Sequence, residues 1–291
     1  MNLKPEIKSK IENAAGEEII SMTSLSGGCI SDAYKLETRS GKRFFLKINF
    51  AASGDMFIKE AHGLNELSKP DAIRIPLVIL FDKSFLLTEF ISQGLKSKNF
   101  WEDFGRKFAK LHKFKSKEPG FYEDNYIGSN AQLNIADGIE KINWTQFYFN
   151  KRLLFQFKLA EKKGYAAKEL REGFSLLEKR IEKILEGSEE KPSLLHGDLW
   201  SGNFMVNESG EACLIDPAVY YGHREADLAM TKLFGGFSFE FYRAYNEHYP
   251  LKDGYEYREG IYKLYHVLNH LNLFGRGYYQ QAVSIIHGYT A

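Results

Sequence analysis

One stretch of this sequence constrains the fold more than any other, because it sets three oxygen-bearing side chains at fixed spacings between short apolar segments. Residues 196–203 read HGDLWSGN, and residues 214–216 read LID. Asp198, Asn203 and Asp216 thus follow one another in the order carboxylate, amide, carboxylate. The string H-x-D-x-x-x-x-N…D has the order found in kinase-type phosphoryl transfer. The alternative is a tight loop whose polar side chains only satisfy backbone groups, but the full string rarely arises without the chemistry.

Each member of this set has a predicted task. Asp198 is the predicted catalytic base, which orients the attacking hydroxyl and takes its proton. Asn203 and Asp216 supply the hard oxygen ligands that Mg²⁺ prefers. His196 is expected to brace the loop through hydrogen bonds rather than to titrate. Asp227 is expected to anchor the same loop by accepting backbone N–H bonds.

The residues around the set differ from those of protein kinases. Gly197 stands where protein kinases carry the Arg that responds to activation-loop phosphorylation, and Asp216 is followed by Pro217-Ala218 rather than Phe-Gly. No Ala-Pro-Glu follows downstream. These differences favour a small-molecule kinase with a preassembled site.

Composition excludes several other classes of protein. The 39 basic and 38 acidic residues nearly cancel, so no general attraction to nucleic acid or to an anionic membrane is expected. Only Cys29 and Cys213 are present, in no metal-ligand spacing, which fits a reducing cytosol. The N-terminus lacks a signal-peptide core, and the longest apolar run, Ile75–Phe81, is too short to span a bilayer. We expect a cytoplasmic protein; its oligomeric state is not predicted.

The pattern of apolar residues changes along the chain. Strands are predicted at 18–25, 33–36, 44–48, 77–81 and 85–91, with helices at 4–14 and 55–67. From residue 94 onward the spacing is mainly helical, with helices predicted over 101–111, 144–162 and 170–184. The prediction is an α+β, protein-kinase-like fold of two lobes. A small antiparallel-sheet lobe, 1–92, would bind the nucleotide, and a mainly helical lobe, 93–291, would carry the catalytic and substrate-binding groups.

A glycine turn in the first lobe is the candidate phosphate loop. Adjacent Gly27 and Gly28 would let backbone N–H groups of the loop, including that of Cys29, approach phosphates, and Ser31 could add a hydroxyl donor. A plain strand turn would look similar, and no Walker A lysine follows. A thiol beside such amides could be acidified, so we hypothesise that oxidation of Cys29 inhibits ATP binding.

Further ATP contacts are expected from the next elements. Lys47 lies mid-strand and is expected to hold the α- and β-phosphates in an ion pair with Glu60, although a lysine on a solvated strand face is the alternative. Mid-helix placement favours Glu60 over Glu66 as the partner. The backbone of Glu89, Phe90 and Ile91 would meet the adenine edge. His266 and His270 lie four apart on a predicted helix without the zinc motif, so a packing or capping role is preferred for both.

With these residues in hand, the chain resembles the fructosamine kinase (ketosamine 3-kinase) family, relatives of the aminoglycoside phosphotransferases. The resemblance covers nearly the whole length. It is carried by these segments: LSGGCISDAY at 25–34, the Lys47 strand, EAHGL at 60–64, DNYIG at 124–128, LHGDLWSGN at 195–203, IDPAVYYGHREADLAM at 215–230 and LNHLNLFG at 268–275. Choline and aminoglycoside kinases share only the His-x-Asp and Asp elements.

The resemblance implies ATP-dependent phosphorylation of the sugar 3-hydroxyl of ketoamines, the adducts that reducing sugars form with amines. The 3-phosphate then decomposes and frees the amine, which is deglycation. It also implies a sugar site lined by Asn125, Tyr126, Gly128, Trp200 and His223. Relatives often carry Asn at the position of Ser31, which leaves the phosphate contact of Ser31 open.

Two other functions stay open from the sequence. One is a kinase of another small alcohol, such as a free sugar, an amino alcohol or an aminoglycoside. The other is a catalytically silent nucleotide-binding module, against which the retained Lys47, Asp198, Asn203 and Asp216 argue. The sequence does not choose among fructosamine, ribulosamine and erythrulosamine, free or on protein lysines.

Overall fold

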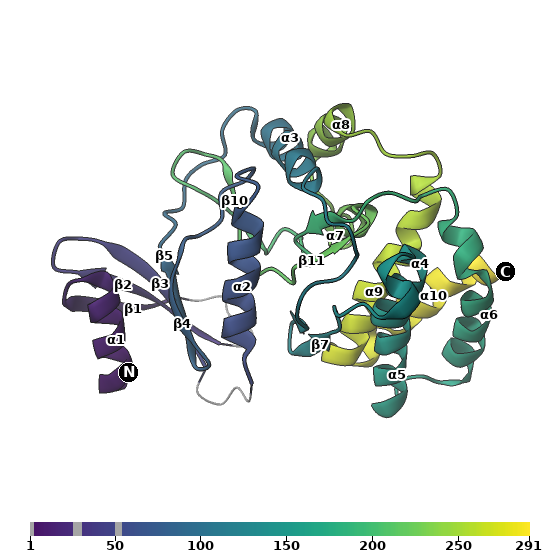
Figure 1. Cartoon of the computed structure of the whole chain (residues 1–291), viewed down its shortest axis with the longest axis horizontal. Coiled ribbons are helices and arrows are strands. Elements are labelled where there is room, and N and C mark those ends of the chain that lie inside the picture. Colours follow the sequence, from purple (N-terminus) through teal and green to yellow (C-terminus); the bar gives the residue numbers. More distant parts are fainter. Residues whose placement is uncertain (1–2, 26–30, 50–53) are drawn as a thin grey trace.

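The computed structural model describes residues 3–25, 31–49 and 54–291. It has a small part built on one sheet and a larger, mainly helical part, with the two chain ends at opposite extremes (Figure 1). Gly27, Gly28 and Cys29 lie outside the described residues, so their predicted contacts with the nucleotide remain predictions.

The small part is a five-stranded antiparallel sheet in the order β1-β2-β3-β5-β4. Its strands are β1 Ile19–Leu25, β2 Asp32–Thr38, β3 Arg43–Ile48, β4 Val78–Asp82 and β5 Phe85–Glu89. Helix α1, Pro5–Ala15, packs Ile11 against Leu36, Leu46 and Leu87 on one face. Helix α2, Met56–Ser68, packs against the other face with Leu86. A strand covered on both faces carries a continuous apolar run rather than an alternating one, which explains the sequence of β5.

The larger part is built from helices around two buried clusters. Its helices are α3 Phe100–His112, α4 Trp144–Tyr148, α5 Phe155–Lys162, α6 Lys168–Leu185, α7 Glu225–Thr231, α8 Phe239–His248, α9 Tyr255–Phe274 and α10 Tyr279–Thr290, with short 3₁₀ segments η1 Gly138–Lys141 and η3 Arg276–Tyr278. A π-helical turn, η2 Phe149–Leu154, separates α4 from α5, so the single helix predicted over 144–162 is interrupted. Helix α9 runs through the interior, with buried residues along most of its length.

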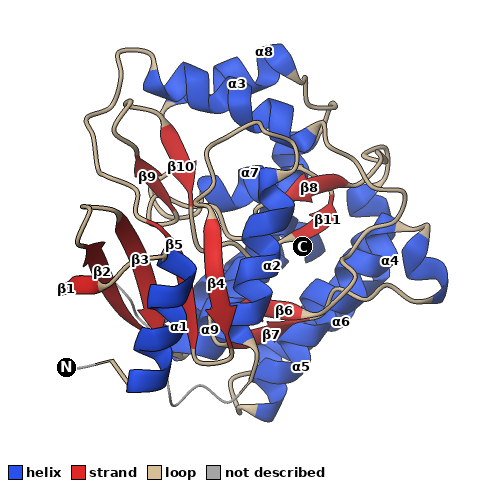
Figure 2. Cartoon of the chain, turned by 60° about the vertical axis from the view of Figure 1, so that its left-hand side comes forward, coloured by secondary structure: helices blue, strands red, loops and turns tan. Residues whose placement is uncertain are grey.

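Three short ribbons of antiparallel strands lie among these helices (Figure 2). They pair β6 Asn125–Ile127 with β7 Asn130–Gln132, β8 Ser193–Leu195 with β11 Tyr220–Gly222, and β9 Phe204–Val206 with β10 Ala212–Leu214. The catalytic segment leaves the end of β8, and Asp216 follows the end of β10. The ribbons therefore bring the two halves of the motif to one place.

The predicted α+β, protein-kinase-like architecture is confirmed in its two parts, a small antiparallel sheet and a helical remainder. The last strand of the sheet is shorter than predicted: β5 ends at Glu89, and Phe90 and Ile91 begin the connection to α3. The division of the chain at residues 92 and 93 stays a prediction. No helix in the described ranges is both long and apolar enough to cross a membrane.

Candidate active site

The catalytic loop begins with a glycine that no other residue can replace without strain. Gly197 has a φ of +82°, and a Cβ added there would lie 1.9 Å from the carbonyl oxygen of Ala218. Ala218 in turn donates its N–H to the carbonyl of His196 at 2.9 Å. The loop therefore lies directly against the segment that follows Asp216. This close approach explains the Gly where protein kinases carry Arg.

A buried carboxylate holds the start of the loop. The oxygens of Asp227 accept the backbone N–H groups of His196 at 2.7 Å and Gly197 at 2.8 Å. The Nε2 atom of His112 in α3 lies 3.3 Å from the same carboxylate. Burial alone would raise the pKa of Asp227, but the contact with His112 and the N–H bonds outweigh it and lower that pKa. Asp227 makes the contacts that an anchoring role requires.

His196 ties the loop to the strand end that carries the second carboxylate. Its fully buried ring donates Nε2–H to the carbonyl of Ile215 at 2.9 Å, and its Nδ1 accepts the backbone N–H of Asp198 at 3.3 Å. Burial lowers the pKa of His196, so the ring is neutral and holds one tautomer. These are the bonds of a bracing residue.

Asp198 and Asn203 lie in contact within the loop. The amide nitrogen of Asn203 donates to the backbone carbonyl of Asp198 at 2.7 Å and to its Oδ2 at 3.1 Å. Burial raises the pKa of Asp198 well above the ordinary value, and the charges of Asp216 and Asp227 add to the rise, while the Asn203 bond opposes it. The site thus concentrates negative charge that a cation would relieve.

The sheet contributes a lysine to the same place. Lys47 of β3 donates to Glu60 of α2 at 2.7 Å and also to the Oδ1 of Asp216. Burial alone would lower the pKa of Lys47, but the two carboxylates raise it, so the ammonium group stays protonated. This ion-paired chain joins the sheet, α2 and the catalytic segment, and it selects Glu60 over Glu66 as the partner of the lysine.

The residues present fit a magnesium ion. Both hydrogen bonds of the Asn203 side chain use its nitrogen, which leaves its oxygen as a ligand, and the Asp216 side chain is 46% exposed. Asp216 has a φ of +54°, a left-handed conformation in which Asp is one of the few residues tolerated. Among the described residues no three His, Cys, Asp or Glu side chains form a metal cluster. Mg²⁺ in kinases needs none, because phosphates and water complete its shell.

The other predicted nucleotide contacts lie at the ends of two inner strands of the sheet, β2 and β5. Ser31 precedes β2 directly and is half-buried. The Glu89 side chain is held by Arg74 at 2.5 Å and by the N–H of Leu77 at 2.8 Å, and its own N–H donates to the carbonyl of Leu77 at 2.9 Å. The acceptor left for an adenine is its backbone carbonyl, which also accepts the Thr88 hydroxyl at 3.1 Å. The N–H of Phe90 donates to the carbonyl of Arg43 at 3.3 Å, and Ile91 is buried.

Two of the five predicted sugar-site residues are buried among protein partners. Asn125 is buried; it donates to the carbonyl of Val219 at 2.8 Å and accepts from Gln132 and Asn134. His223 is 4% exposed, and its ring contacts the carbonyl of Ser188 at 2.7 Å. These protein partners already use the polar side-chain atoms of both residues, and their contact with a sugar stays a prediction.

The remaining three predicted sugar-site residues, Tyr126, Gly128 and Trp200, differ in their contacts and in how exposed they are. Tyr126 is half-buried and donates its hydroxyl to Asp55 at 3.0 Å. Gly128 has a φ of +60°, and a Cβ there would lie 2.8 Å from Leu273 of α9. Trp200 is 36% exposed and packs edge-on against Phe234 at 5.8 Å between ring centroids. Trp200 is thus the most accessible of the predicted sugar contacts.

The sequence did not single out the contacts that hold α2 in place. Glu123 accepts a hydrogen bond from Lys59 at 2.7 Å and lies 2.8 Å from the Nδ1 of His62. One and a half turns further along α2, Glu66 accepts the hydroxyl of Tyr221 at 2.8 Å. No local pattern marks Glu123 as a partner of α2, because the partners are about 60 residues apart.

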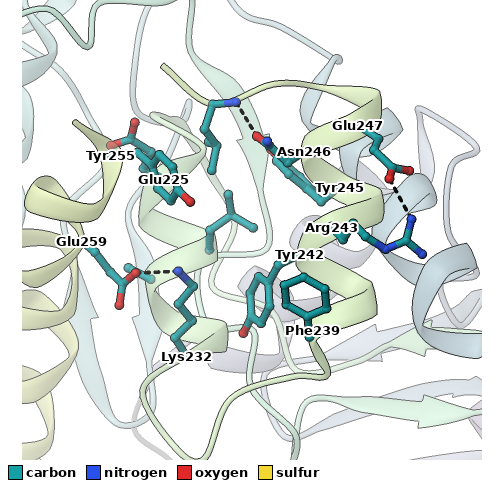
Figure 3. Close-up of a pocket in the computed structure, with 13 residues that line it drawn as sticks. Glu225, Lys232, Phe239, Tyr242, Arg243, Tyr245, Asn246, Glu247, Tyr255 and Glu259 are labelled. Carbon is teal, nitrogen blue, oxygen red and sulfur yellow. Dashed lines mark hydrogen bonds and ion pairs between the residues drawn. The ribbon is translucent and has the colours of Figure 1, made fainter. Parts of the chain in front are cut away.

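A separate hollow of about 320 Å³ lies between α7, α8 and the start of α9 (Figure 3). Tyr242, Phe239 and Lys232 line it, with Lys232 paired to Glu259 at 2.6 Å. None of the predicted site residues lines this hollow.

Comparison with known proteins decides the family. The model of the family described as fructosamine kinase matches residues 3–291. The chain belongs to the fructosamine kinase family. It is 40% identical over 279 residues to a chloroplastic protein-ribulosamine 3-kinase of Oryza sativa subsp. indica, covering 94% of this chain and 79% of the relative. It is 36% identical over 287 residues to a probable ketoamine kinase of Synechocystis sp., covering 96% and 94% of the two chains.

Solved structures agree with this fructosamine kinase family assignment. A Thermobifida fusca protein provisionally described as a fructosamine-3-kinase superposes with a TM-score of 0.87 at 29% identity, covering 97% of both chains. The aminoglycoside phosphotransferase APH(2″)-Ib superposes with a TM-score of 0.63 at 16% identity over 99% of this chain and 98% of its own. At that identity the second likeness shows the shared kinase-like fold alone.

Proposed function

We propose that this member of the fructosamine kinase family transfers the γ-phosphoryl group of ATP to the sugar 3-hydroxyl of a ketosamine, free or on a protein lysine. The observation that carries the proposal is the ion-paired chain Glu60–Lys47–Asp216, which ends beside the loop of Asp198 and Asn203. It sets a phosphate-binding cation against a metal-binding carboxylate and a base, which is the set that phosphoryl transfer needs.

In the proposed reaction the residues of this chain act mainly by position and charge. Lys47 would hold the α- and β-phosphates, and Asp198 would accept a hydrogen bond from the acceptor hydroxyl and take its proton late in the transfer. The acceptor oxygen forms the new bond to the γ-phosphorus as the bond to the βγ-bridging oxygen breaks, and that oxygen leaves with the electron pair on ADP. Glu60 would keep Lys47 in place, and the backbone of residues 89–91 would meet the adenine.

Asn203 and Asp216 would hold Mg²⁺ in this proposal. A bound Mg²⁺ supplies positive charge to the phosphate oxygens, and it would also favour the ionised form of nearby Asp198. The predicted cytoplasmic location and the predicted first lobe, 1–92, and second lobe, 93–291, belong to the same proposal. Deglycation would follow from spontaneous loss of the 3-phosphate.

The acceptor class comes from the relatives. Those with the printed names protein-ribulosamine 3-kinase and probable ketoamine kinase align over more than nine-tenths of this chain. Among the predicted sugar contacts, Trp200 and Tyr126 keep part of their surface open. Together they support a ketosamine rather than a free sugar, an amino alcohol or an aminoglycoside.

The test is a reaction of the purified protein with ATP, Mg²⁺ and a panel of acceptors, with the new phosphate located by NMR. The panel holds fructosamine, ribulosamine and erythrulosamine adducts of lysine, free fructose, choline and an aminoglycoside. We expect phosphate on O3 of one or more ketosamines. Turnover confined to the other acceptors would contradict the proposal.

Replacement of the base tests the assignment of Asp198. We expect Asp198→Asn to lower kcat by roughly 10²- to 10⁴-fold while the Kd for ATP stays within about threefold, because only the acceptor side loses its base. Asp253→Asn, an exposed carboxylate far along the chain, is the matched control and should keep wild-type kinetics. Near-normal turnover of Asp198→Asn would show that Asp198 is not the base.

A further inference from the structure

One buried polar atom near the proposed base has no hydrogen-bond partner. His266 lies on α9 and is 3% exposed, and its Nδ1 bonds to no group in the described part of the chain. That nitrogen lies 3.9 Å from the Oδ1 of Asp198. A buried nitrogen left without a partner costs free energy, so this atom calls for an explanation.

The two oxygens of Asp198 face different groups. Oδ2 accepts the amide of Asn203 at 3.1 Å, whereas Oδ1 faces His266. A separation of 3.9 Å is too long for a direct hydrogen bond. It allows one intervening oxygen about 2.8 Å from both atoms, with an angle of roughly 90° between the two hydrogen bonds at that oxygen.

His266 is uncharged at neutral pH and can still donate one hydrogen bond. Burial lowers its pKa to about 3, with a further contribution from His270, so the imidazole carries one hydrogen at neutral pH. In its proposed role as base, with Mg²⁺ nearby, Asp198 is ionised, and an ionised carboxylate only accepts hydrogen bonds. A bare nitrogen lone pair facing Oδ1 of Asp198 would be repelled, which favours the tautomer with its hydrogen on Nδ1.

We propose that His266 is a substrate-binding residue of the phosphoryl transfer and holds the acceptor hydroxyl against Asp198. The acceptor oxygen would accept the Nδ1–H of His266 and donate its own hydrogen to Oδ1 of Asp198. This inference rests on the proposed function and adds a second contact at the reacting oxygen. One lone pair of that oxygen is then bound to His266, its proton points at the base, and its other lone pair is free to attack the γ-phosphorus. His266 keeps its proton throughout.

The competing explanation is an ordered water between the two residues that only steadies Asp198. The two explanations differ in what they predict for binding of the acceptor. A residue that holds the reacting hydroxyl strengthens binding of the ketosamine, whereas a residue that only steadies Asp198 leaves that binding unchanged. The Kd of the ketosamine, compared with the Kd of its 3-deoxy analogue, which lacks the reacting hydroxyl, separates them.

Three substitutions of His266 test whether an N–H group is needed at the position of Nδ1. His266→Asn can place an amide N–H near the site of Nδ1, His266→Gln places it near the site of Nε2, and His266→Leu removes it. With saturating ATP, we expect kcat/KM for the ketosamine to fall roughly 10- to 100-fold in His266→Leu and His266→Gln, and by less than about fivefold in His266→Asn. The Kd of the 3-deoxy analogue and the KM for ATP should change less than about twofold in all three variants, while the Kd of the ketosamine rises in His266→Leu and His266→Gln.

Val267, the next residue on α9, serves as the control for a loss of packing in the helical core. Val267 is buried but belongs to the helical core, so Val267→Ala should lower the melting temperature and leave kcat/KM within about twofold. The inference is overturned if His266→Leu keeps wild-type kcat/KM, if His266→Asn is as impaired as His266→Leu, or if His266→Leu leaves the Kd of the ketosamine unchanged.

These outcomes are distinct from failure of the proposed function. If the wild-type protein phosphorylates no ketosamine, or if Asp198→Asn retains turnover, the proposed function falls and this inference falls with it. If Asp198→Asn is inactive and His266→Leu is normal, only the role of His266 is wrong.

Discussion

Gly197 shows how a single missing side chain determines the shape of the catalytic loop. Its left-handed φ and the 1.9 Å approach of a would-be Cβ to the carbonyl of Ala218 are two separate obstacles to any other residue. A left-handed conformation costs an L-residue about 1–2 kcal/mol, and a contact this close forces the backbone apart. We expect Gly197→Ala to lower the melting temperature and to reduce kcat by more than about 100-fold, measured by thermal unfolding and steady-state kinetics.

Gly164 provides the matched control for this substitution. It has a φ of +73°, close to that of Gly197, but no atom lies within 4 Å of a Cβ added there. Gly164→Ala should therefore show only the cost of the left-handed conformation and keep full activity. If both variants behave alike, the approach to Ala218 has no effect on the catalytic loop.

Helix α2 is held at two places by the larger part of the molecule. Glu123 binds Lys59 and His62, and the hydroxyl of Tyr221 binds Glu66. Glu60, the partner of Lys47, lies within the first of these places, between Lys59 and His62 in the sequence. The helix that supplies the ion pair is thus fixed by the fold itself, which agrees with the absence of an Ala-Pro-Glu segment and of the loop arginine.

Loss of one of these contacts should loosen the ATP site without destroying it. Glu123→Gln removes the charge that faces Lys59 and His62, and the pair is only partly exposed. We expect a two- to tenfold rise in the KM for ATP and a fall in kcat of similar size, because the Lys47–Glu60 pair is less often in place. Steady-state kinetics with varied ATP measure both.

Glu118 gives a control of the same chemistry nearby. Its exposed carboxylate lies 4.0 Å from Lys141, a weak surface pair. Glu118→Gln should change neither KM nor kcat. Wild-type ATP kinetics in Glu123→Gln would show that α2 is held by packing alone.

The molecule as a whole should be sensitive to mild acid because it buries several neutral histidines. Burial lowers the pKa of His112, His196, His223 and His266. Below about pH 6.5 the unfolded chain binds more protons at these positions than the folded chain does. The contribution of these histidines to the free energy of unfolding therefore falls as pH falls, by up to about 1.4 kcal/mol per group at pH 5.5, against a smaller opposing contribution from Asp198, whose pKa is raised. We expect the melting temperature to drop by about 5 °C or more between pH 7.5 and 5.5.

Two substitutions check the source of this pH dependence. His266→Asn should make the slope of melting temperature against pH shallower, because one buried imidazole is removed. His287→Asn should leave the slope unchanged, since that side chain is 57% exposed. A melting temperature that is flat or rises on acidification would contradict the explanation.

The fold could be predicted from the sequence because its signals are local. The apolar runs at 77–81 and 85–91, the glycine and proline breaks and the helical spacing after residue 94 each indicate an element within a few residues. The catalytic set could be predicted for a similar reason, since Asp198 and Asn203 lie within one loop and Asp216 follows after a single ribbon.

What could not be predicted depends on contacts between distant segments. Asn125 and His223 have the residue types of a sugar site, yet the fold encloses them, and only their three-dimensional surroundings show it. For His266 the sequence predicts packing or capping, and nothing in the sequence of α9 indicates that Asp198 lies 3.9 Å from its ring. Burial and long-range pairing are properties of the assembled chain, and a lone His or Asn carries no local sign of either.

Asp227 joins the interior of the helical part directly to the reacting loop, through His112 on one side and the N–H groups of His196 and Gly197 on the other. Loosening of the interior would then misplace Asp198, the proposed base, before the whole chain unfolded. The loss of activity on heating should follow the thermal unfolding curve, and no partly unfolded form of the protein should keep activity. In a cell, the rates of synthesis, chaperone rescue and proteolysis would set how much activity is present.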